Sequence, residues 1–218
     1  MTADLAGLGK RLSAERLRQE RSQRELARTV GVSASLISQI EAGKVQPSVV
    51  TLMAIVTELD MSIDELLRGV DASDAPGGEP EPTRHDDPTS PLGSQQPSAP
   101  KVHLRHSALQ NLEQRESIVL SSGVTWERLT PSPDDHVDFI LVTYPPGATS
   151  SEGEQMLTHS GKEYWYVLSG CVRVHLVFDE FEAGPGDSFA FECTLPHRFY
   201  NGGEEKMSAV VMIVHNVG

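Results

Sequence analysis

The stretch SQRELARTVGVSASLISQIEAGKVQPSVVTLMAIVTELDMSIDELL, residues 22–67, decides the fold of the first third of the chain. It contains three consecutive signals for the start of a helix. Ser22 is followed three residues later by Glu25, which is the spacing of a capping box. Ser33 can cap a second helix that we expect to run to about residue 41, and Ser48 follows a proline and opens another.

The first two of these helices are joined by a tight turn. Gly31 is the residue type that ends a helix in the left-handed conformation. The apolar residues around it fall on inward positions: Leu26, Val30, Val32, Ile37 and Ile40. Ser35, Ser38 and Gln39 are left to face outward. A helix, a tight turn and a second helix with small polar residues on its exposed face form a helix-turn-helix.

The segment resembles the XRE/Cro-type (lambda-repressor-like) DNA-binding domains. The matching text is SQRELA, GVSASLISQIEAGK and PSVVTLMAIVTEL, within residues 9–67. In that family the helix that begins near Ser33 enters the major groove of DNA. The resemblance implies a positioning role for Gln23, base-facing roles for Ser33, Ser35, Ser38 and Gln39, and phosphate contacts for Arg24, Arg28 and Lys44.

Two features qualify this resemblance. Glu20 and Arg21 stand where the family usually has a glycine and an apolar residue. The alternative is a set of ordinary capped helices whose arginines form a solvated face.

Because one such domain contacts only a few base pairs, we expect a homodimer that reads half-sites about one helical turn apart, ~34 Å.

The composition changes once along the chain. Residues 71–100 hold seven of the fourteen prolines and a single large apolar residue, Leu92. Such a segment cannot bury enough apolar surface to offset its ordering entropy, which predicts a disordered linker between a domain at 1–70 and a domain at 101–218. A flexible chain of this length spans on the order of 30 Å, so the two domains need not touch.

The charge balance excludes some classes of protein. The net charge of −13 argues against a chain that coats nucleic acid along its whole surface, whereas residues 1–70 are neutral and hold seven basic against three acidic groups between Lys10 and Arg28. No apolar run approaches the ~20 residues of a membrane span, and the first residues show no apolar signal-peptide core. Two cysteines cannot form a disulfide framework. We therefore expect a cytoplasmic protein with no membrane partner.

The second half of the chain shows a different periodicity. Short runs rich in β-branched and aromatic residues recur at 139–144, 164–168, 172–178, 189–191 and 210–214, between glycine and proline punctuation. Short strands at this spacing predict an all-β sandwich or barrel. The expected fold class is thus multidomain, with α-helices followed by an all-β domain.

Two patches in this half resemble the motifs of the cupin superfamily, whose fold is a small jelly-roll β-barrel with its ligand site inside. His159, Glu163 and Gly170 fit the spacing of the first family motif, but Leu157 occupies the position of an earlier histidine. The resemblance predicts five N-terminal helices of lambda-repressor type, a linker and a C-terminal cupin barrel.

The second cupin motif is matched in part. Gly186, His197 and Asn201 fit its offsets, while Glu192 and Thr194 replace a proline and a glycine.

The chemistry of these residues predicts a metal site. Two imidazoles and a carboxylate, from His159, His197 and Glu163, form the facial triad of non-haem Fe(II), and Zn²⁺ or Ni²⁺ can use the same ligands. The alternative is a pair of neutral histidines hydrogen-bonded inside a dry barrel with Glu163 as partner.

The remaining candidates are weaker. Trp165, Phe191 and Phe199 are candidates for the wall of a small-molecule pocket, although core packing explains the same residues. His175 is expected on a strand face, His136 in solvent, and His103 and His106 without a carboxylate cluster; Cys171 and Cys193 are expected to be buried, with a redox role for Cys193 held open.

These observations favour a sequence-specific transcription regulator that binds double-stranded operator DNA and whose barrel senses a small-molecule effector, with at most one divalent metal. No catalytic residue is assigned. The alternative is a mononuclear non-haem iron oxidoreductase, because the XRE-plus-cupin organisation and the ligand spacing are similar to those of hydroxypropylphosphonate epoxidases. The acidic barrel sequence, with a net charge of −8 over residues 101–218, disfavours an anionic substrate. A third interpretation is a DNA-bound module whose barrel only dimerises.

Overall fold

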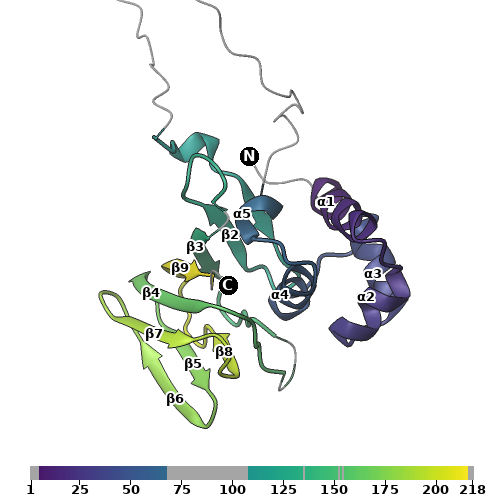
Figure 1. Cartoon of the computed structure of the whole chain (residues 1–218). Coiled ribbons are helices and arrows are strands. Elements are labelled where there is room, and N and C mark those ends of the chain that lie inside the picture. The colour runs from purple at the N-terminus through teal and green to yellow at the C-terminus, as the bar shows by residue number, and fades with distance from the viewer. Residues whose placement is uncertain (1–4, 68–107, 135, 152, 154, 216–218) are drawn as a thin grey trace, which may run out of the picture.

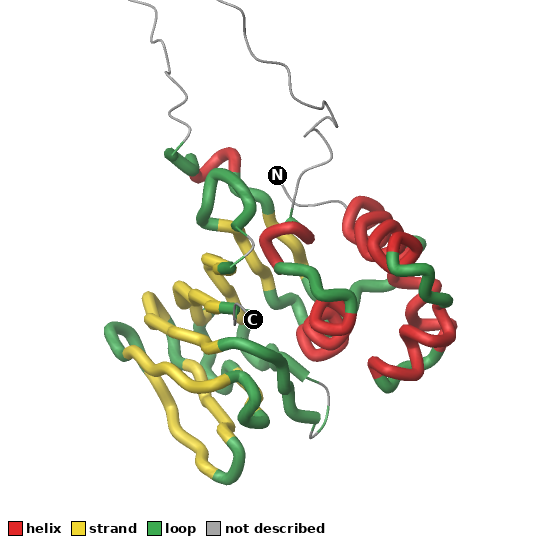
Figure 2. The backbone as a smooth tube through the Cα atoms, viewed as in Figure 1, coloured by secondary structure: helices red, strands yellow, loops and turns green. Residues whose placement is uncertain are grey.

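The helices form one lobe of the molecule (Figures 1 and 2). The computed structural model describes residues 5–67, 108–134, 136–151, 153 and 155–215. Its helices are α1 (Leu5–Arg18), α2 (Gln23–Val30), α3 (Ala34–Glu41), α4 (Val49–Glu58) and α5 (Ile63–Leu66), with a short 3₁₀ turn at Leu112–Gln114. The predicted linker, 71–100, lies outside the described residues.

The predicted helix starts are confirmed. Ser22 and Glu25 form a reciprocal capping box at α2, and Ser33 and Ser48 cap α3 and α4 through their side-chain oxygens. Gly31 ends α2 at φ 79°, in the left-handed region. Ser62 and Glu65 form a further capping box at the start of α5, which was not predicted from the sequence.

The two unusual residues before α2 have a physical explanation. Glu20 has φ 56°, so it takes the left-handed conformation that a glycine adopts without strain. Arg21 reaches the C-terminal end of α4, where its guanidinium donates to the Glu58 carbonyl at 2.8 Å and pairs with the Glu58 carboxylate at 2.5 Å. A polar cap therefore replaces the apolar contact expected at this position.

The C-terminal half folds into two antiparallel sheets that face each other as a barrel (Figure 1). One sheet has the order β1-β2-β3-β9-β4-β7 and the other β6-β5-β8. The strands are β1 (Ser117–Val119), β2 (Thr125–Arg128), β3 (Val137–Tyr144), β4 (Lys162–Ser169), β5 (Val172–Leu176), β6 (Asp179–Ala183), β7 (Ser188–Glu192), β8 (His197–Tyr200) and β9 (Met207–Val214). The all-β expectation is confirmed, and all five predicted runs lie on strands, although the third ends early because Val177 turns the chain at φ 58°.

Side chains of the large sheet alternate between the barrel interior and the outside. Glu163, Trp165 and Val167 of β4 are buried, whereas Tyr164 and Tyr166 between them are exposed. The interior is thus apolar except for a few polar groups, one of which is Glu163.

The two lobes are in contact, which the length of the predicted linker did not require. Helix α4 lies between helices α1–α3 and the barrel (Figure 1), and α5 packs on β3. Among the described residues, backbone amides that bond across the junction include those of Val50, to the Ser150 carbonyl (3.1 Å), Ser121, to the Pro47 carbonyl (3.0 Å), and Asp64, to the Asp138 carboxylate (2.9 Å). The buried side chains of both lobes form one continuous cluster.

Candidate functional site: a DNA-binding face and a barrel centre

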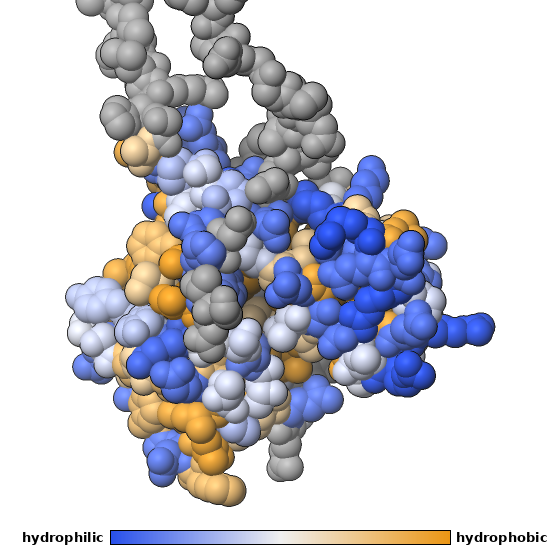
Figure 3. All heavy atoms as spheres, viewed as in Figure 1, coloured by the Kyte–Doolittle hydropathy of each residue, from blue (hydrophilic) through white to orange (hydrophobic). Residues whose placement is uncertain are grey.

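The exposed face of α3 carries the residues predicted to contact bases. Ile37 and Ile40 are buried against the other helices, while Ser35, Ser38 and Gln39 are exposed on the opposite side. Arg24 and Arg28 on α2 and Lys44 after α3 are exposed as well. Hydrophilic residues cover most of the visible side of this lobe in the space-filling view (Figure 3). The lobe therefore presents a polar helix and exposed cations, which suits a DNA groove.

Two predicted DNA contacts are partly engaged within the protein. The Ser33 hydroxyl oxygen accepts the Leu36 N–H, because it is the N-cap of α3. The Gln23 amide donates to the Glu41 carboxylate at 2.8 Å, and the same carboxylate is held by the buried Arg16 at 2.6 Å. Burial would raise the pKa of Glu41, but hydrogen bonds from Arg16 and Gln23 hold it below its usual value. The carboxylate thus fixes the Gln23 side chain at the start of α2.

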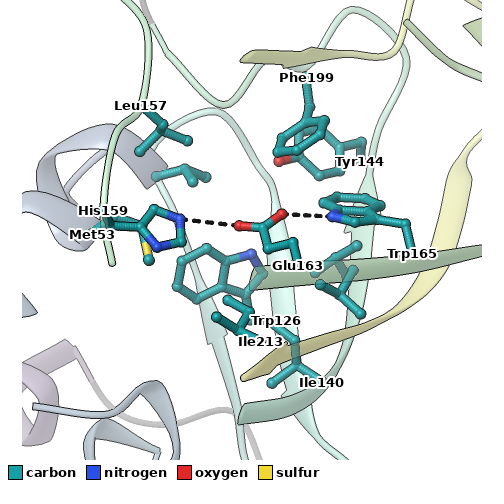
Figure 4. Close-up of a pocket in the computed structure, with 13 residues that line it drawn as sticks. Met53, Trp126, Ile140, Tyr144, Leu157, His159, Glu163, Trp165, Phe199 and Ile213 are labelled. Carbon is teal, nitrogen blue, oxygen red and sulfur yellow. Dashed lines mark hydrogen bonds and ion pairs between the residues drawn. The ribbon is translucent and has the colours of Figure 1, made fainter. Parts of the chain in front are cut away.

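Inside the barrel, the three predicted metal ligands come together. Figure 4 shows two of them, His159 and Glu163, facing each other. Glu163 projects from β4, His159 lies just before it, and His197 enters from β8 of the opposite sheet. The His159 Nε2 lies 3.0 Å from Glu163 Oε1, and the His197 Nε2 lies 3.8 Å from the same oxygen. All three side chains are buried, and their ligand atoms lie within 4.8 Å of one another.

The surrounding hydrogen bonds show that this group fits a cation. His159 Nδ1 lies 3.0 Å from the Ser160 carbonyl and His197 Nδ1 lies 2.8 Å from the Leu195 carbonyl, so each Nδ1 carries the donated hydrogen. In neutral rings both Nε2 atoms then direct lone pairs toward Glu163. His197 Nε2 is fully buried and has no hydrogen-bond partner among the residues that the structure describes. Lone pairs facing a carboxylate require a proton or a metal ion between them, and backbone-anchored Nδ1–H groups are the usual outer shell of metal-ligating histidines.

The protonation states suit ligation at neutral pH. Burial lowers the pKa of His197, and the nearby Glu163 only partly offsets this. Burial would raise the pKa of Glu163, but the Trp165 N–H, 2.6 Å from Oε2, and the hydrogen bond and positive charge that His159 and His197 supply when protonated together hold it below its ordinary value. A neutral imidazole and a carboxylate are the forms that bind a metal.

The cavity beside this group is small and mostly apolar. Its volume is about 20 Å³, room for about one water-sized particle. Trp165 and Phe199, two of the predicted pocket residues, line it, whereas Phe191 is buried behind and packs 4.8 Å from the His197 ring. Leu157, in place of the family's first histidine, closes one side.

Sequence reasoning missed several residues of this cavity. Trp126 and Tyr144 come from β2 and β3, and Val49 and Met53 come from α4 of the other lobe (Figure 4). In the sequence, the α4 residues have the periodicity of a helix core, and nothing distinguishes a residue that packs on its own domain from one that packs on the barrel.

Of the remaining candidates, Cys193 lies beside the centre, where its carbonyl accepts the His159 N–H at 3.0 Å. His175 is half-buried on β5 beside Glu180, and His136 is exposed. Asn201 is buried, and its amide donates to two backbone carbonyls. Both cysteines are free, and burial raises the pKa of Cys193, which disfavours the reactive thiolate. His103 and His106 lie outside the described residues.

The comparisons agree with both halves of this picture. Residues 12–66 match the helix-turn-helix family, and residues 140–214 match the cupin domain family. The chain thus joins an XRE-type helix-turn-helix domain to a cupin barrel, the organisation of a DNA-binding transcriptional regulator. It is similar to the HTH-type transcriptional regulator PuuR of Escherichia coli (strain K12) and of Shigella flexneri, at 28% identity over 88% of this chain and 86% of each relative.

Solved structures share the fold. An HTH_3 family transcriptional regulator from Vibrio cholerae superposes with a TM-score of 0.61 at 19% identity, over 98% of both chains. Hydroxypropylphosphonic acid epoxidase from S. wedmorenis superposes with a TM-score of only 0.41 at 16% identity, a similarity too weak to bear on activity. Within the described residues, no helix is long and apolar enough to cross a bilayer.

Proposed function

We propose that this regulator binds operator DNA as a homodimer in the cytoplasm, through α3, and that its barrel senses a small molecule at a centre holding one divalent metal. The observation that carries the DNA-binding role is the division of α3 into a fully buried apolar face and an exposed polar one, away from the barrel.

The contacts divide by chemistry. Hydroxyl and amide side chains of Ser35, Ser38 and Gln39 suit base edges in the major groove, and Ser33, at the helix start, lies beside them. Gln23, held in place by Glu41, and the cations Arg24, Arg28 and Lys44 suit phosphates and set the register of the helix without reading sequence.

A gel shift with the DNA upstream of the chain's own gene tests this role. Gln39→Ala and Ser35→Ala should weaken the specific complex while leaving binding to random DNA unchanged, because base contacts carry specificity. Leu17→Ala, an exposed apolar position on α1, is the matched control. Failure of wild-type protein to retard this DNA at low salt would count against the proposal.

The outer face of the large sheet supports dimerisation by a second copy. Two rows of paired residues cross it: Phe139, Met212 and Tyr164 in one row, and Leu141, Val210 and Tyr166 in the next. Phe139, Tyr164 and Tyr166 are exposed, and Leu168 extends the patch. An exposed apolar face of this kind suits a two-fold interface, and a two-fold pair is what a palindromic operator requires.

The metal would be held by His159, Glu163 and His197. When bound it would supply positive charge and open coordination positions for a ligand atom. The chain's own contribution is to keep both Nε2 atoms and the Glu163 carboxylate oriented through the Ser160 and Leu195 carbonyls and the Trp165 N–H.

The oxidoreductase alternative and the sensing role meet the same geometric limit. An organic substrate or effector beside the three ligands needs space, and the adjoining cavity of about 20 Å³ has no room for one while α4 is in place.

A further inference from the structure

The start of helix α4 is completed by the barrel. In an α-helix the first N–H groups have no partner within the helix. The Ser48 hydroxyl accepts the Thr51 N–H. The N–H of Val50 donates to the Ser150 carbonyl of the barrel lobe. The same arrangement recurs at α5, where Asp64 N–H donates to Asp138 of β3. These hydrogen bonds dock the DNA-binding lobe on the barrel. We call the contact of α4 and α5 with the barrel the seat, and the docked arrangement the seated state.

The side chains next to this seat form part of the wall of the sensor cavity. Val49 and Met53 are only 3% and 5% exposed and line the same cavity as His159 and Glu163. Met53 lies beside the His159 ring (Figure 4). Pockets for organic ligands measure on the order of 300–1,000 Å³. With α4 in place, the cavity of about 20 Å³ admits one ion or one water and nothing larger.

We propose that α4 of the DNA-binding lobe and an organic ligand compete for the mouth of the barrel, so that ligand entry releases the helix-turn-helix lobe from its seat. The inference rests on the proposed sensing role of the barrel. The released part is the helix whose Leu52, Ile55 and Leu59 form the core of its own lobe, so the lobe moves as a unit and keeps its fold.

Release would change where the α3 helices of a dimer lie, and would leave unchanged which side chains α3 exposes. Ser35, Ser38 and Gln39 of α3 are exposed in the seated state, so the DNA-binding face is available in both states. Seating fixes how far apart the α3 helices of a dimer lie, and release removes that constraint, which lowers the effective concentration of the second helix at its half-site.

Hydrogen exchange of the full-length chain tests the seat directly. The amides of Val50, Asp64 and Ser121 should be protected in wild type, since their partners lie across the junction. Val49→Asp suits the first turn of a free helix but buries a charge when seated, and Met53→Trp adds bulk without charge. Each should accelerate exchange at these amides by roughly a hundredfold or more while the amides of α2 and α3 keep their protection.

Ala34→Asp is the matched control, because it places the same charge at the first position of α3, away from the barrel. It should leave the junction amides protected. Unprotected junction amides in wild type, or unchanged protection in both seat variants, would overturn the proposal.

Competition is tested with a neutral apolar dye, 1-anilinonaphthalene. It should bind the Val49→Asp protein at least about tenfold more tightly than wild type, because apparent affinity scales with the open fraction. Saturating dye should also deprotect the Val50 amide of wild type. Dye that binds wild type with this amide still protected contradicts competition. Gel shifts test the DNA-binding role separately. If dye exposes the Val50 amide but the protein retards no DNA, the DNA-binding role is refuted and the competition between α4 and the ligand is still supported.

Discussion

At the scale of single residues, His197 gives the sharpest test of the metal centre. Its Nε2 is buried without a partner, so a bound cation would satisfy it. Adding Zn²⁺ or Ni²⁺ to metal-free protein should raise the melting temperature of wild type, since a ligand that binds only the folded state stabilises it. His197→Ala should abolish that rise, and His175→Ala, half-buried on the neighbouring strand β5, should keep it; equal shifts in all three would exclude this site.

Two titrating residues at the lobe junction predict how stability depends on pH. Burial raises the pKa of Asp64 to about 6, and the neighbouring Asp138 adds to this, while the Thr130 hydroxyl partly offsets it. The hydrogen bond to Asp138 likewise raises the pKa of His215. For each group the folded chain binds its proton more tightly than the unfolded chain does, so its contribution is greatest below the unfolded pKa and is lost as pH rises through the folded one.

The melting temperature should therefore fall between pH 4 and about 6 through Asp64, and further above pH 6.5 through His215. Asp64→Asn should flatten the first interval and His215→Gln the second, measured by thermal unfolding across the pH series. A wild-type profile that rises over both intervals would contradict the assignment.

Much of the residue-scale picture could be predicted. The spacing of His159, Glu163 and His197 led to a cluster that the barrel does assemble. The tautomers could not be predicted, because the carbonyls of Ser160 and Leu195 that set them carry no sequence signal.

At the scale of elements, the crossing of α1 over α3 depends on Gly9. A Cβ at this position would lie 2.4 Å from the carbonyl oxygens of Ile40 and Glu41. Gly9→Ala should force the helices apart and lower the free energy of unfolding by about 1–3 kcal/mol, measured by urea denaturation. Ala14→Ser, at an exposed position of the same helix, should change it by less than about 0.5 kcal/mol.

Elements were predicted where a local signal marks them. Ser22, Ser33 and Ser48 announce their helices through the capping hydroxyl, and alternation marks the long strands β3 and β4. Strands β1, β2, β6 and β8 were not predicted. β6 has the polar sequence DEFEA, because most of the strand is exposed. Its pairing with β5 depends on tertiary contacts, which short-range sequence patterns do not encode.

At the scale of the whole molecule, the exposed face of the large sheet predicts the oligomeric state. Tyr166→Asp places a charge at the β4 end of the second apolar row and should convert a dimer to monomers in analytical ultracentrifugation. Operator affinity should fall by about 10²-fold or more with it, because the second half-site is no longer tethered. Phe178→Asp makes the same change at a hairpin tip that is 99% exposed, and should do neither. A dimeric Tyr166→Asp protein would place the interface elsewhere.

The contact between the lobes was the part least accessible from sequence. A segment rich in proline argued for independent units, and the contact instead depends on surfaces of α4 and α5 that each look like ordinary helix core. Only the three-dimensional arrangement shows that Val49 and Met53 belong to the barrel cavity as much as to their own lobe.

The seat of α4 also has a thermal consequence. Its hydrogen bonds are exchanged for bonds to water when the helix leaves, so the net attraction comes mainly from the burial of Val49 and Met53. Apolar burial weakens on cooling. The free energy for exposing the Val50 amide should therefore be smaller at 5 °C than at 25 °C. Release of α4 from the barrel should accordingly cost less in the cold.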